Sequence, residues 1–306
     1  MNSEAGKVYK LNLHFECNNR CSFCCVDKNI SGEPIEATLK NIASFAEKGG
    51  ESLIISGGEP LIFKEIIDLI SFAKDKGIKN FGVQTNGRML YYKDFVKELG
   101  NFRSINFLVS FHFPNRKLYR KYCGSDGFHE TVEGIKNLVD CGISFRTNTV
   151  IMRPNLFHLQ ENIDLLKELG TEDFEFYFIS GKNITDEYKK FVPRYSECLP
   201  VLKKILKKNI DSDIILKGFP VCIIGENALK KRLNHYITPE RAKTDTGQAP
   251  AFDYVFPNCE ECIYRSSRPG SSPKRKIGSA GCCPGVKKDY VNFYGIREFK
   301  PITEIW

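Results

Sequence analysis

The chain has 306 residues, of which 42% are hydrophobic and 12% aromatic, so it can bury a substantial core in one large domain with an appendage. No apolar run approaches the ~20 residues of a membrane span, and Met1–Lys10 lacks the apolar stretch of a signal peptide, so we expect a cytoplasmic protein without a membrane partner. The net charge of +8 is scattered apart from four lysines on one helical face, which argues against a nucleic-acid partner.

Strands and helices alternate along the first two thirds of the chain. The sequence predicts strands at Val8–Phe15, Ser52–Ser56, Lys79–Gln84, Ile105–Ser110, Ile143–Ile151 and Phe174–Ile179. It predicts helices at Ile35–Lys48, Phe63–Lys76, Tyr91–Leu99, Thr131–Cys141 and Leu156–Leu169, and a helical connection at Glu187–Lys208. Six β-α units predict an α/β fold with a partial barrel in residues 1–210, followed by a small cysteine-rich extension in residues 211–306.

Twelve cysteines in a chain expected in the cytoplasm favour metal binding over disulfides. Cys17, Cys21 and Cys24 follow the first predicted strand with the spacing C-x3-C-x2-C. Three thiolates on one short loop suit three irons of a [4Fe–4S] cluster, and the missing fourth ligand leaves one iron open to another molecule. A zinc site is an alternative, and Cys25 is an alternative to Cys24 because C-x3-C-x3-C also fits.

The cysteine loop resembles that of radical S-adenosylmethionine (radical SAM) enzymes, in which a CxxxCxxC loop follows the first strand of a partial (β/α)6 TIM-type barrel. The family spacing favours Cys24 over Cys25. Two further segments resemble the family's GGEP and TNG motifs, and each ends or follows a predicted strand. They are Gly57, Gly58, Glu59 and Pro60 after the second strand, and Thr85, Asn86 and Gly87 at the third.

The resemblance, which covers roughly residues 8–180, implies an enzyme with a catalytic [4Fe–4S] cluster and AdoMet as cofactors. In the family, the open iron binds the amino and carboxylate groups of AdoMet. The reduced cluster cleaves AdoMet to methionine and a 5′-deoxyadenosyl radical, which takes a hydrogen atom from the substrate. A flavodoxin- or ferredoxin-type electron donor is the partner that this chemistry implies.

The resemblance also implies contacts to AdoMet. Glu59, with Gly57 and Gly58, would hold the methionine end, whereas Thr85, Asn86 and Ser110 would orient the remainder. Arg146 and Asn148 lie in the fifth strand, where family members hold the AdoMet carboxylate and ribose. Phe23 would pack near the adenine or belong to the core, and His112 would contact AdoMet or substrate.

A second cysteine set lies in the last third of the chain. It comprises Cys222, Cys259, Cys262 and Cys283, with Cys282 as an alternative to Cys283 and with Tyr290 downstream. The segment resembles a C-terminal extension of the SPASM or shorter twitch type, which implies one auxiliary [4Fe–4S] cluster. A structural zinc site and a redox-active CxxC thiol pair fit the same spacing.

Two substrate classes follow from the resemblance. The first is a peptide or protein, which the enzyme would modify as an oxidoreductase or maturase. The alternative is a small metabolite such as a sugar, a nucleoside or a cofactor precursor. A ferredoxin-like electron carrier and a zinc-dependent nucleic-acid-binding protein are the non-catalytic alternatives. Cys123, in the loop expected after the fourth strand, is an ordinary loop residue or a hydrogen-atom donor.

Overall fold

The computed structural model describes residues 7–26, 31–179, 190–224, 254–255 and 286–300. These residues form two compact units. The first contains the chain up to Asn148 together with Asp164–Thr171, and the second contains Thr149–Ile163 and the described residues from Glu172 onward. The cysteine loop and every residue that the sequence assigns to AdoMet therefore lie in the first unit. The domain boundary expected at residue 210 is a different division and stays a prediction.

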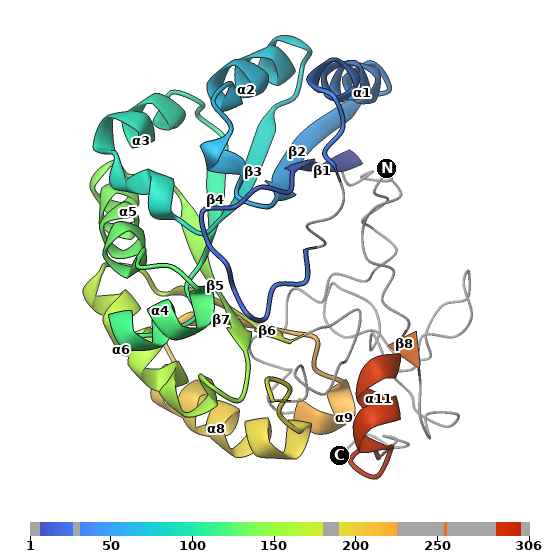
Figure 1. Ribbon diagram of the computed structural model, residues 1–306, viewed down its shortest axis with the longest axis vertical. Coiled ribbons are helices and arrows are strands. Elements are labelled where there is room, and N and C mark those ends of the chain that lie inside the picture. The colour runs from blue at the N-terminus through green and yellow to red at the C-terminus, as the bar shows by residue number, and fades with distance from the viewer. Residues whose placement is uncertain (1–6, 27–30, 180–189, 225–253, 256–285, 301–306) are drawn as a thin grey trace. The chain divides into compact units, whose positions relative to one another are not determined.

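A seven-stranded sheet, in which the strands lie in chain order, forms the centre of the fold (Figure 1). Its strands are β1 (Lys7–His14), β2 (Gly50–Gly57), β3 (Asn80–Thr85), β4 (Ile105–Ser110), β5 (Phe145–Ile151), β6 (Asp173–Phe178) and β7 (Asp213–Lys217). The pairs with a known register, β1–β2, β2–β3, β3–β4, β4–β5 and β6–β7, are all parallel. The sheet is thus the open α/β sheet of a partial TIM-type barrel, as the sequence predicts.

Helices connect successive parallel strands, because parallel pairing needs a crossover connection. They are α1 (Ile35–Glu47), α2 (Ile66–Asp75), α3 (Lys93–Gly100), α4 (Arg116–Cys123), α5 (Phe128–Asp140), α6 (Leu159–Glu168) and α8 (Tyr195–Lys208). Two further helices, α9 (Val221–Ile224) and α11 (Lys288–Tyr294), follow β7. The short 3-10 helices are η1 (Pro60–Ile62), η2 (Arg88–Tyr91) and η3 (Leu156–His158), and an antiparallel pair joins β8 (Tyr254–Val255) to β9 (Val286–Lys287).

The two faces of strands β1 to β5 differ sharply, because successive side chains of a strand point to opposite faces. One face carries fully buried apolar side chains, such as Leu11, Ile55 and Val83. Tyr9 on this face has its ring 5.4 Å from that of Phe45 in α1, so this is the face that the helices cover (Figure 1). The other face is partly exposed and mostly polar, and the functional motifs end on it.

The sequence prediction lacks α4 and β7, as well as the small elements α9, α11, β8 and β9 toward the C-terminus. In α4, four basic residues obscure the apolar pattern, although its ends are well marked: Asn115 Oδ1 accepts from Leu118 N at 3.0 Å, and Gly124 closes the helix with φ +67°. The short strand β7 offers only three consecutive apolar residues. Cys123, expected in a loop, is the buried last residue of α4.

An aromatic cluster forms the core between α8, α11 and β6 in the second unit. Its centre is Tyr195, whose ring lies 4.2 Å from that of Phe178 and 4.5 Å from that of Tyr290. The Tyr195 hydroxyl donates to the Gly218 carbonyl at 2.9 Å, and the Tyr290 hydroxyl donates to Glu298 at 2.8 Å. Large apolar rings with satisfied hydroxyls make this cluster a source of stability.

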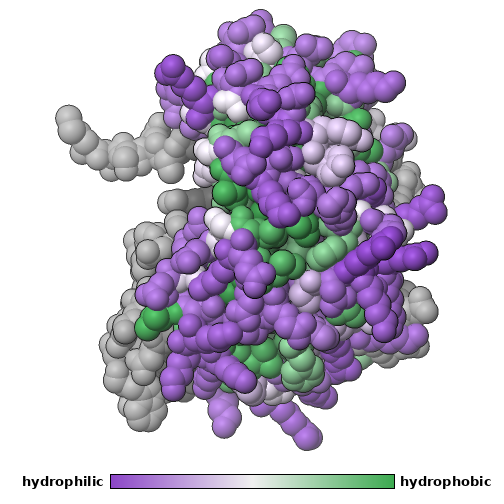
Figure 2. All heavy atoms as spheres, turned by 90° about the vertical axis from the view of Figure 1, so that its left-hand side faces the viewer, coloured by the Kyte–Doolittle hydropathy of each residue, from purple (hydrophilic) through white to green (hydrophobic). Residues whose placement is uncertain are grey.

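The surface seen in Figure 2 is mostly hydrophilic, with hydrophobic side chains showing between the polar ones. Large exposed hydrophobic side chains in the described ranges are spread along the sequence, and Phe157 is the most exposed at 79%. Within those same ranges, the helices are too short or too polar to cross a bilayer.

Candidate functional site

The three predicted cluster ligands lie on the loop that leaves the carboxyl end of β1. Cys17 and Cys21 are half-buried, and Cys24 and its alternative Cys25 are exposed. The Cys24 amide donates to the Cys21 carbonyl at 3.2 Å, which closes a tight turn between the second and third predicted ligands. The loop thus has no regular secondary structure, and it carries its thiols at the strand end where barrel enzymes place their active sites.

The cysteine loop is paired through its backbone with the end of α4. The Arg20 amide donates to the Cys123 carbonyl at 2.9 Å, and the Ser22 amide donates to the Tyr122 carbonyl at 2.9 Å. A side chain at Gly124 would meet the Arg20 carbonyl at 2.4 Å, so glycine permits this close approach. The missed helix α4 is therefore part of the support of the candidate site.

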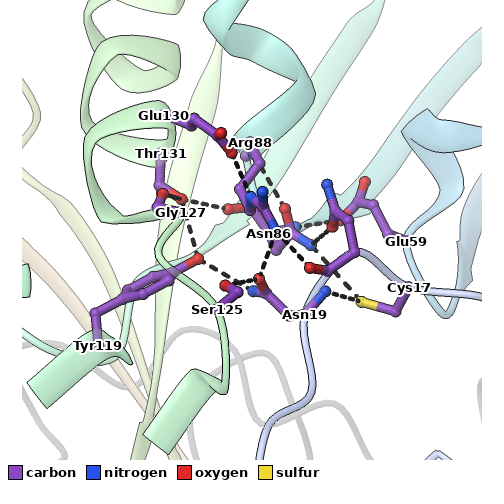
Figure 3. Close-up of polar contacts among 12 residues, drawn as sticks. Cys17, Asn19, Glu59, Asn86, Arg88, Tyr119, Ser125, Gly127, Glu130 and Thr131 are labelled. Carbon is purple, nitrogen blue, oxygen red and sulfur yellow. Dashed lines mark hydrogen bonds and ion pairs between the residues drawn. The ribbon is translucent and has the colours of Figure 1, made fainter. Parts of the chain in front are cut away.

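Asn19, between the first two cysteines, is the centre of a polar network (Figure 3). Its Nδ2 donates to the Tyr119 hydroxyl at 3.0 Å, and its Oδ1 accepts from Ser125 Oγ at 2.6 Å and from Arg88 Nη1 at 3.1 Å. The side chain is 5% exposed, and all its polar atoms are bonded. Because a buried amide with these partners has one favourable orientation, Asn19 fixes the path of the loop.

Arg88, from η2 after the TNG segment, ties the cysteine loop to α5. Its guanidinium donates to the Asn18 carbonyl and to Asn19 Oδ1, and it forms an ion pair with Glu130. The Arg88 side chain is only 16% exposed. A side chain at Gly127 would meet Arg88 Nε at 2.3 Å, so glycine leaves the room for the guanidinium.

Asn86 of the TNG segment contacts the first cysteine directly. Its Nδ2 lies 3.7 Å from Cys17 Sγ and donates to Asn18 Oδ1 at 2.7 Å, and the backbone amide of Asn19 lies 3.4 Å from the same sulfur. Burial raises the pKa of the Cys17 thiol, whereas the bond from Asn19 lowers it. Two N–H groups that point at one sulfur are suited to stabilise a thiolate bound to iron.

Glu59 joins the GGEP and TNG motifs. It is fully buried, and its carboxylate accepts from Thr85 Oγ1 at 2.6 Å, from the Asn86 amide at 2.6 Å and from the Leu61 amide at 3.1 Å. Burial raises the pKa of Glu59 to about 6, against the lowering effect of these bonds. The described partners of this carboxylate are protein groups, so its expected role at the AdoMet ammonium stays a prediction.

The double glycine of the GGEP motif packs against the backbone that leaves β1. Gly57 has φ +126°, and a side chain there would meet the His14 carbonyl at 2.3 Å. A side chain at Gly58 would meet the Glu16 carbonyl at 2.0 Å. The Gly58 amide donates to the His14 carbonyl at 2.7 Å. Glycine is therefore required here for close approach to the chain's own backbone. Whether Gly57 and Gly58 also hold the methionine end of AdoMet stays a prediction.

The remaining predicted AdoMet contacts lie at the end of β4 and in the first half of β5. Ser110 is the last residue of β4, and it is in register with Asn148 on β5. Asn148 Oδ1 is buried and has no hydrogen-bond partner within the described ranges. Arg146 is in register with Leu108, one row deeper in the sheet.

Phe23 and His112 pack against each other. Phe23 is 8% exposed, and its ring meets that of His112 at 5.1 Å with an interplanar angle of 88°. Burial lowers the pKa of His112 to about 4, which keeps the imidazole neutral at pH 7. The structure therefore includes Phe23 in buried packing at the cysteine loop, and whether either ring also meets AdoMet stays a prediction.

Cys123 contacts the cysteine loop twice. Its carbonyl accepts from the Arg20 amide, and its thiol shares a hydrogen bond with Cys21. It is 1% exposed. A hydrogen bond with Cys21, together with burial, raises the pKa of the Cys123 thiol, so this group stays protonated at neutral pH. A protonated thiol next to a predicted cluster ligand is positioned to donate a weak hydrogen bond to that sulfur.

Most of the second cysteine set lies outside the described residues, namely Cys259, Cys262, Cys282 and Cys283. Cys222 is half-buried on the short helix α9. Tyr290, proposed as part of this region, is buried in the aromatic cluster of the second unit. The auxiliary cluster and its alternatives therefore stay predictions.

The donor chemistry of the loop fits a [4Fe–4S] cluster. In the described ranges, no three His, Cys, Asp or Glu side chains converge as a site for a single metal ion. A cube needs no such convergence, because each thiolate binds a different iron, and soft sulfur donors suit it. Asn148 Oδ1, which is buried without a hydrogen-bond partner in the described ranges and is in register with the end of β4, likewise fits a polar cofactor such as AdoMet.

Comparison with known proteins agrees with this geometry. Residues 11–155 match the model of the radical SAM superfamily. A probable GTP 3′,8-cyclase of Saccharolobus islandicus (strain M.14.25 / Kamchatka #1) is 26% identical over 220 residues, which cover 68% of this chain and 70% of that protein.

Solved structures show the same fold. SuiB of Streptococcus suis, in a crystal structure with its precursor peptide SuiA, gives a TM-score of 0.58 at 19% identity and covers 70% of this chain. Coproporphyrinogen III oxidase (HemN) of Escherichia coli gives a TM-score of 0.55 at 14% identity over 68% of this chain. The present chain covers only about half of each, 49% of SuiB and 52% of HemN. The motifs, the fold and these matches agree: residues 11–155 of this chain are similar to the domain of the radical SAM superfamily.

Proposed function

We propose that this chain uses its cysteine loop to hold a [4Fe–4S] cluster and cleaves AdoMet reductively to start a radical reaction on a small metabolite. The observation that carries the proposal is the position of Asn86. Its backbone amide donates to Glu59 of the GGEP motif, and its side chain reaches Cys17 and Asn18 of the cysteine loop. One residue thus joins the three motifs that the family uses for cluster and cofactor.

The chain's own residues have separate tasks in this proposal. Cys17, Cys21 and Cys24 bind three irons, and the open iron with bound AdoMet supplies the 5′-deoxyadenosyl radical. Asn86 and the Asn19 amide stabilise the charge on Cys17 Sγ. Asn148 of β5 accepts a hydrogen bond from AdoMet, and the buried Phe23 keeps water from one side of the cysteine loop.

A small metabolite is the substrate class that the curated relative favours. The probable GTP 3′,8-cyclase shares 26% identity over 68% of this chain, whereas SuiB and HemN support the fold alone. Peptide or protein maturation is the second candidate. It is favoured by the second cysteine set, which resembles the twitch-type extensions of peptide-modifying enzymes, and it would require the auxiliary [4Fe–4S] cluster.

The test is anaerobic reconstitution followed by incubation with dithionite and AdoMet. We expect the wild-type chain to release 5′-deoxyadenosine. A variant in which Cys17, Cys21 and Cys24 are all replaced by alanine should form no 5′-deoxyadenosine and should bind about four fewer irons. Cys25→Ala is the matched control for Cys24→Ala, and only the latter should abolish the product. A folded wild-type chain that binds no iron or leaves AdoMet intact contradicts the proposal.

A second arm tests the peptide candidate. Cys259→Ala with Cys262→Ala should lower bound iron from about eight to about four if these residues hold an auxiliary cluster. If the wild-type chain holds only about four irons and zinc in addition, the second cysteine set is a structural zinc site and an auxiliary redox role is excluded.

A further inference from the structure

The fold brings a second cysteine against one of the predicted cluster ligands. The Cys123 thiol shares a hydrogen bond with Cys21. Cys123 ends α4 and is buried, whereas Cys21 lies half-buried on the cysteine loop. The motifs described above do not include Cys123, so the contact between the two thiols comes from the approach of α4 to the loop and not from the cluster spacing.

Backbone hydrogen bonds hold the two segments together on both sides of Cys21. The Arg20 amide donates to the Cys123 carbonyl and the Ser22 amide donates to the Tyr122 carbonyl, both at 2.9 Å. Segments joined by such bonds run about 5 Å apart. This spacing lies within the range of about 4.4–6.8 Å that a disulfide spans between Cα atoms. A covalent link between the two sulfurs therefore needs rotation of side chains and no separation of the backbones.

Other cysteines lie near Cys21 in the sequence, but their surroundings differ. The Cys17 sulfur faces two N–H groups, and Cys24 is exposed. Cys123 is only 1% exposed, so a reagent from solvent reaches its sulfur through Cys21. An accessible thiol beside a second thiol is the arrangement of redox-sensing pairs, in which one cysteine meets the oxidant and the other resolves the product.

We propose that Cys21 and Cys123 form a reversible disulfide when the cluster is absent, and that this link keeps the cysteine loop from taking up a cluster until it is reduced. The oxidant is a small-molecule disulfide such as oxidised glutathione. The regulatory role rests on the function proposed above, because it needs Cys21 to be a cluster ligand. Disulfides that form in reducing surroundings are transient and redox-sensing, which fits a link that opens again.

The link forms in two thiol–disulfide exchanges. The Cys21 sulfur attacks one sulfur of oxidised glutathione, which breaks that S–S bond, forms a mixed disulfide and releases one glutathione thiol. The Cys123 sulfur then attacks Cys21 Sγ and releases the second glutathione thiol. Two protein thiols are oxidised, one disulfide is reduced to two thiols, and the two protons pass from the protein to glutathione.

The link and the cluster exclude each other, because Cys21 Sγ cannot hold an iron and a disulfide partner at once. The two exchanges also differ in rate. The hydrogen bond with Cys21, together with burial, raises the pKa of the Cys123 thiol, so we expect the second exchange to be the slower one. The mixed disulfide at Cys21 should therefore appear before the link.

The test compares the full chain without a cluster and after anaerobic reconstitution, both freed of reductant and then treated with oxidised glutathione. Remaining thiols are alkylated, and mass spectrometry of the digested chain maps the disulfides. Without a cluster, we expect glutathione at Cys21 first and the Cys21–Cys123 link afterwards. With the cluster in place, both products should be lost.

Iron uptake tests the regulatory role. The linked chain, mixed with a preformed [4Fe–4S] cluster on a carrier protein, should take up about four fewer irons than the reduced chain, and dithiothreitol should restore the difference. Cys123→Ser should lose the link and keep glutathione at Cys21. Cys141→Ser, which removes a half-buried cysteine at the end of α5, is the matched control and should keep the link. Circular dichroism shows whether each variant is folded, and the map of the wild-type chain depends on neither.

The outcomes separate the two proposals. A reduced chain that takes up no iron contradicts the function proposed above, and the regulatory role with it, whatever the disulfide map shows. If the reduced chain takes up iron but Cys21 forms no link, or is linked mainly to Cys17 or Cys24, only the present inference is overturned. It is also overturned if the link forms equally with the cluster in place, or if the linked chain takes up as much iron as the reduced chain.

Discussion

The cysteine loop of the first unit and the aromatic cluster of the second are both well packed, but by different interactions. Around Asn19, buried amide, guanidinium and hydroxyl groups hold a loop that has no regular structure. Around Tyr195, stacked rings bury apolar area between elements that are regular. Polar networks define one geometry, whereas apolar packing supplies free energy. The first region should therefore determine cofactor retention and the second should determine stability.

The largest effect on stability is expected at Tyr195. Tyr195→Ala removes a ring that is 1% exposed and leaves a cavity among Phe178 and Tyr290, so the free energy of unfolding should fall by about 4 kcal/mol. Iron content per folded chain should stay at the wild-type level. Urea unfolding followed by circular dichroism, with iron analysis of the folded fraction, checks both. Tyr195→Phe, which loses only the bond to Gly218, should cost about 1 kcal/mol.

Arg88→Leu should show the opposite pattern. It leaves the Asn18 carbonyl without its donor, removes one of the two donors to Asn19 Oδ1 and breaks the ion pair with the half-exposed Glu130, which should cost about 3 kcal/mol and release the cysteine loop. Iron retention after gel filtration should then fall well below that of the wild type. The control is Arg116→Leu, which breaks an exposed ion pair with Asp126. Equal iron retention in the two variants would mean that the network around Asn19 does not hold the cluster loop.

A smaller, pH-dependent effect on the free energy of unfolding is expected at Glu59. Its pKa rises from 4.5 to about 6 on folding, so the folded chain binds more protons than the unfolded chain between these values. The wild type should therefore gain about 2 kcal/mol of stability relative to Glu59→Gln as the pH falls from 7 to 4.5, and lose it as the pH rises again. Urea unfolding of both proteins at the two pH values measures this. A difference that does not change with pH would show that Glu59 is not desolvated by folding.

Much of the fold follows from the sequence because its strands are regular. All six predicted strands are present, and β4 has the predicted bounds. The alternation fails to reveal β7, since five residues with three consecutive apolar ones have no distinctive period. It also fails at α4, where Asn115 and Gly124 mark both ends of a helix that is mainly basic between them.

The residues of the candidate site can be predicted from the sequence only where they belong to a motif. Cys17, Glu59 and Asn86 lie in motifs, and the structure brings them together through hydrogen bonds. Arg88 and Tyr119 belong to no motif, and their contacts with Asn19 depend on how α4 and η2 approach the loop. The two consecutive asparagines inside the cysteine loop are the one sequence signal of this network, because buried amides need partners from elsewhere in the fold.

The most direct measurement is the electron paramagnetic resonance spectrum of the dithionite-reduced chain with and without AdoMet. Cys259→Ala with Cys262→Ala removes any signal from an auxiliary cluster, so that only the cluster of the cysteine loop contributes. If Cys17, Cys21 and Cys24 leave one iron open, AdoMet should change the spectrum and 5′-deoxyadenosine should form. An unchanged spectrum from a chain that retains about four irons would contradict an AdoMet-binding cluster in this loop.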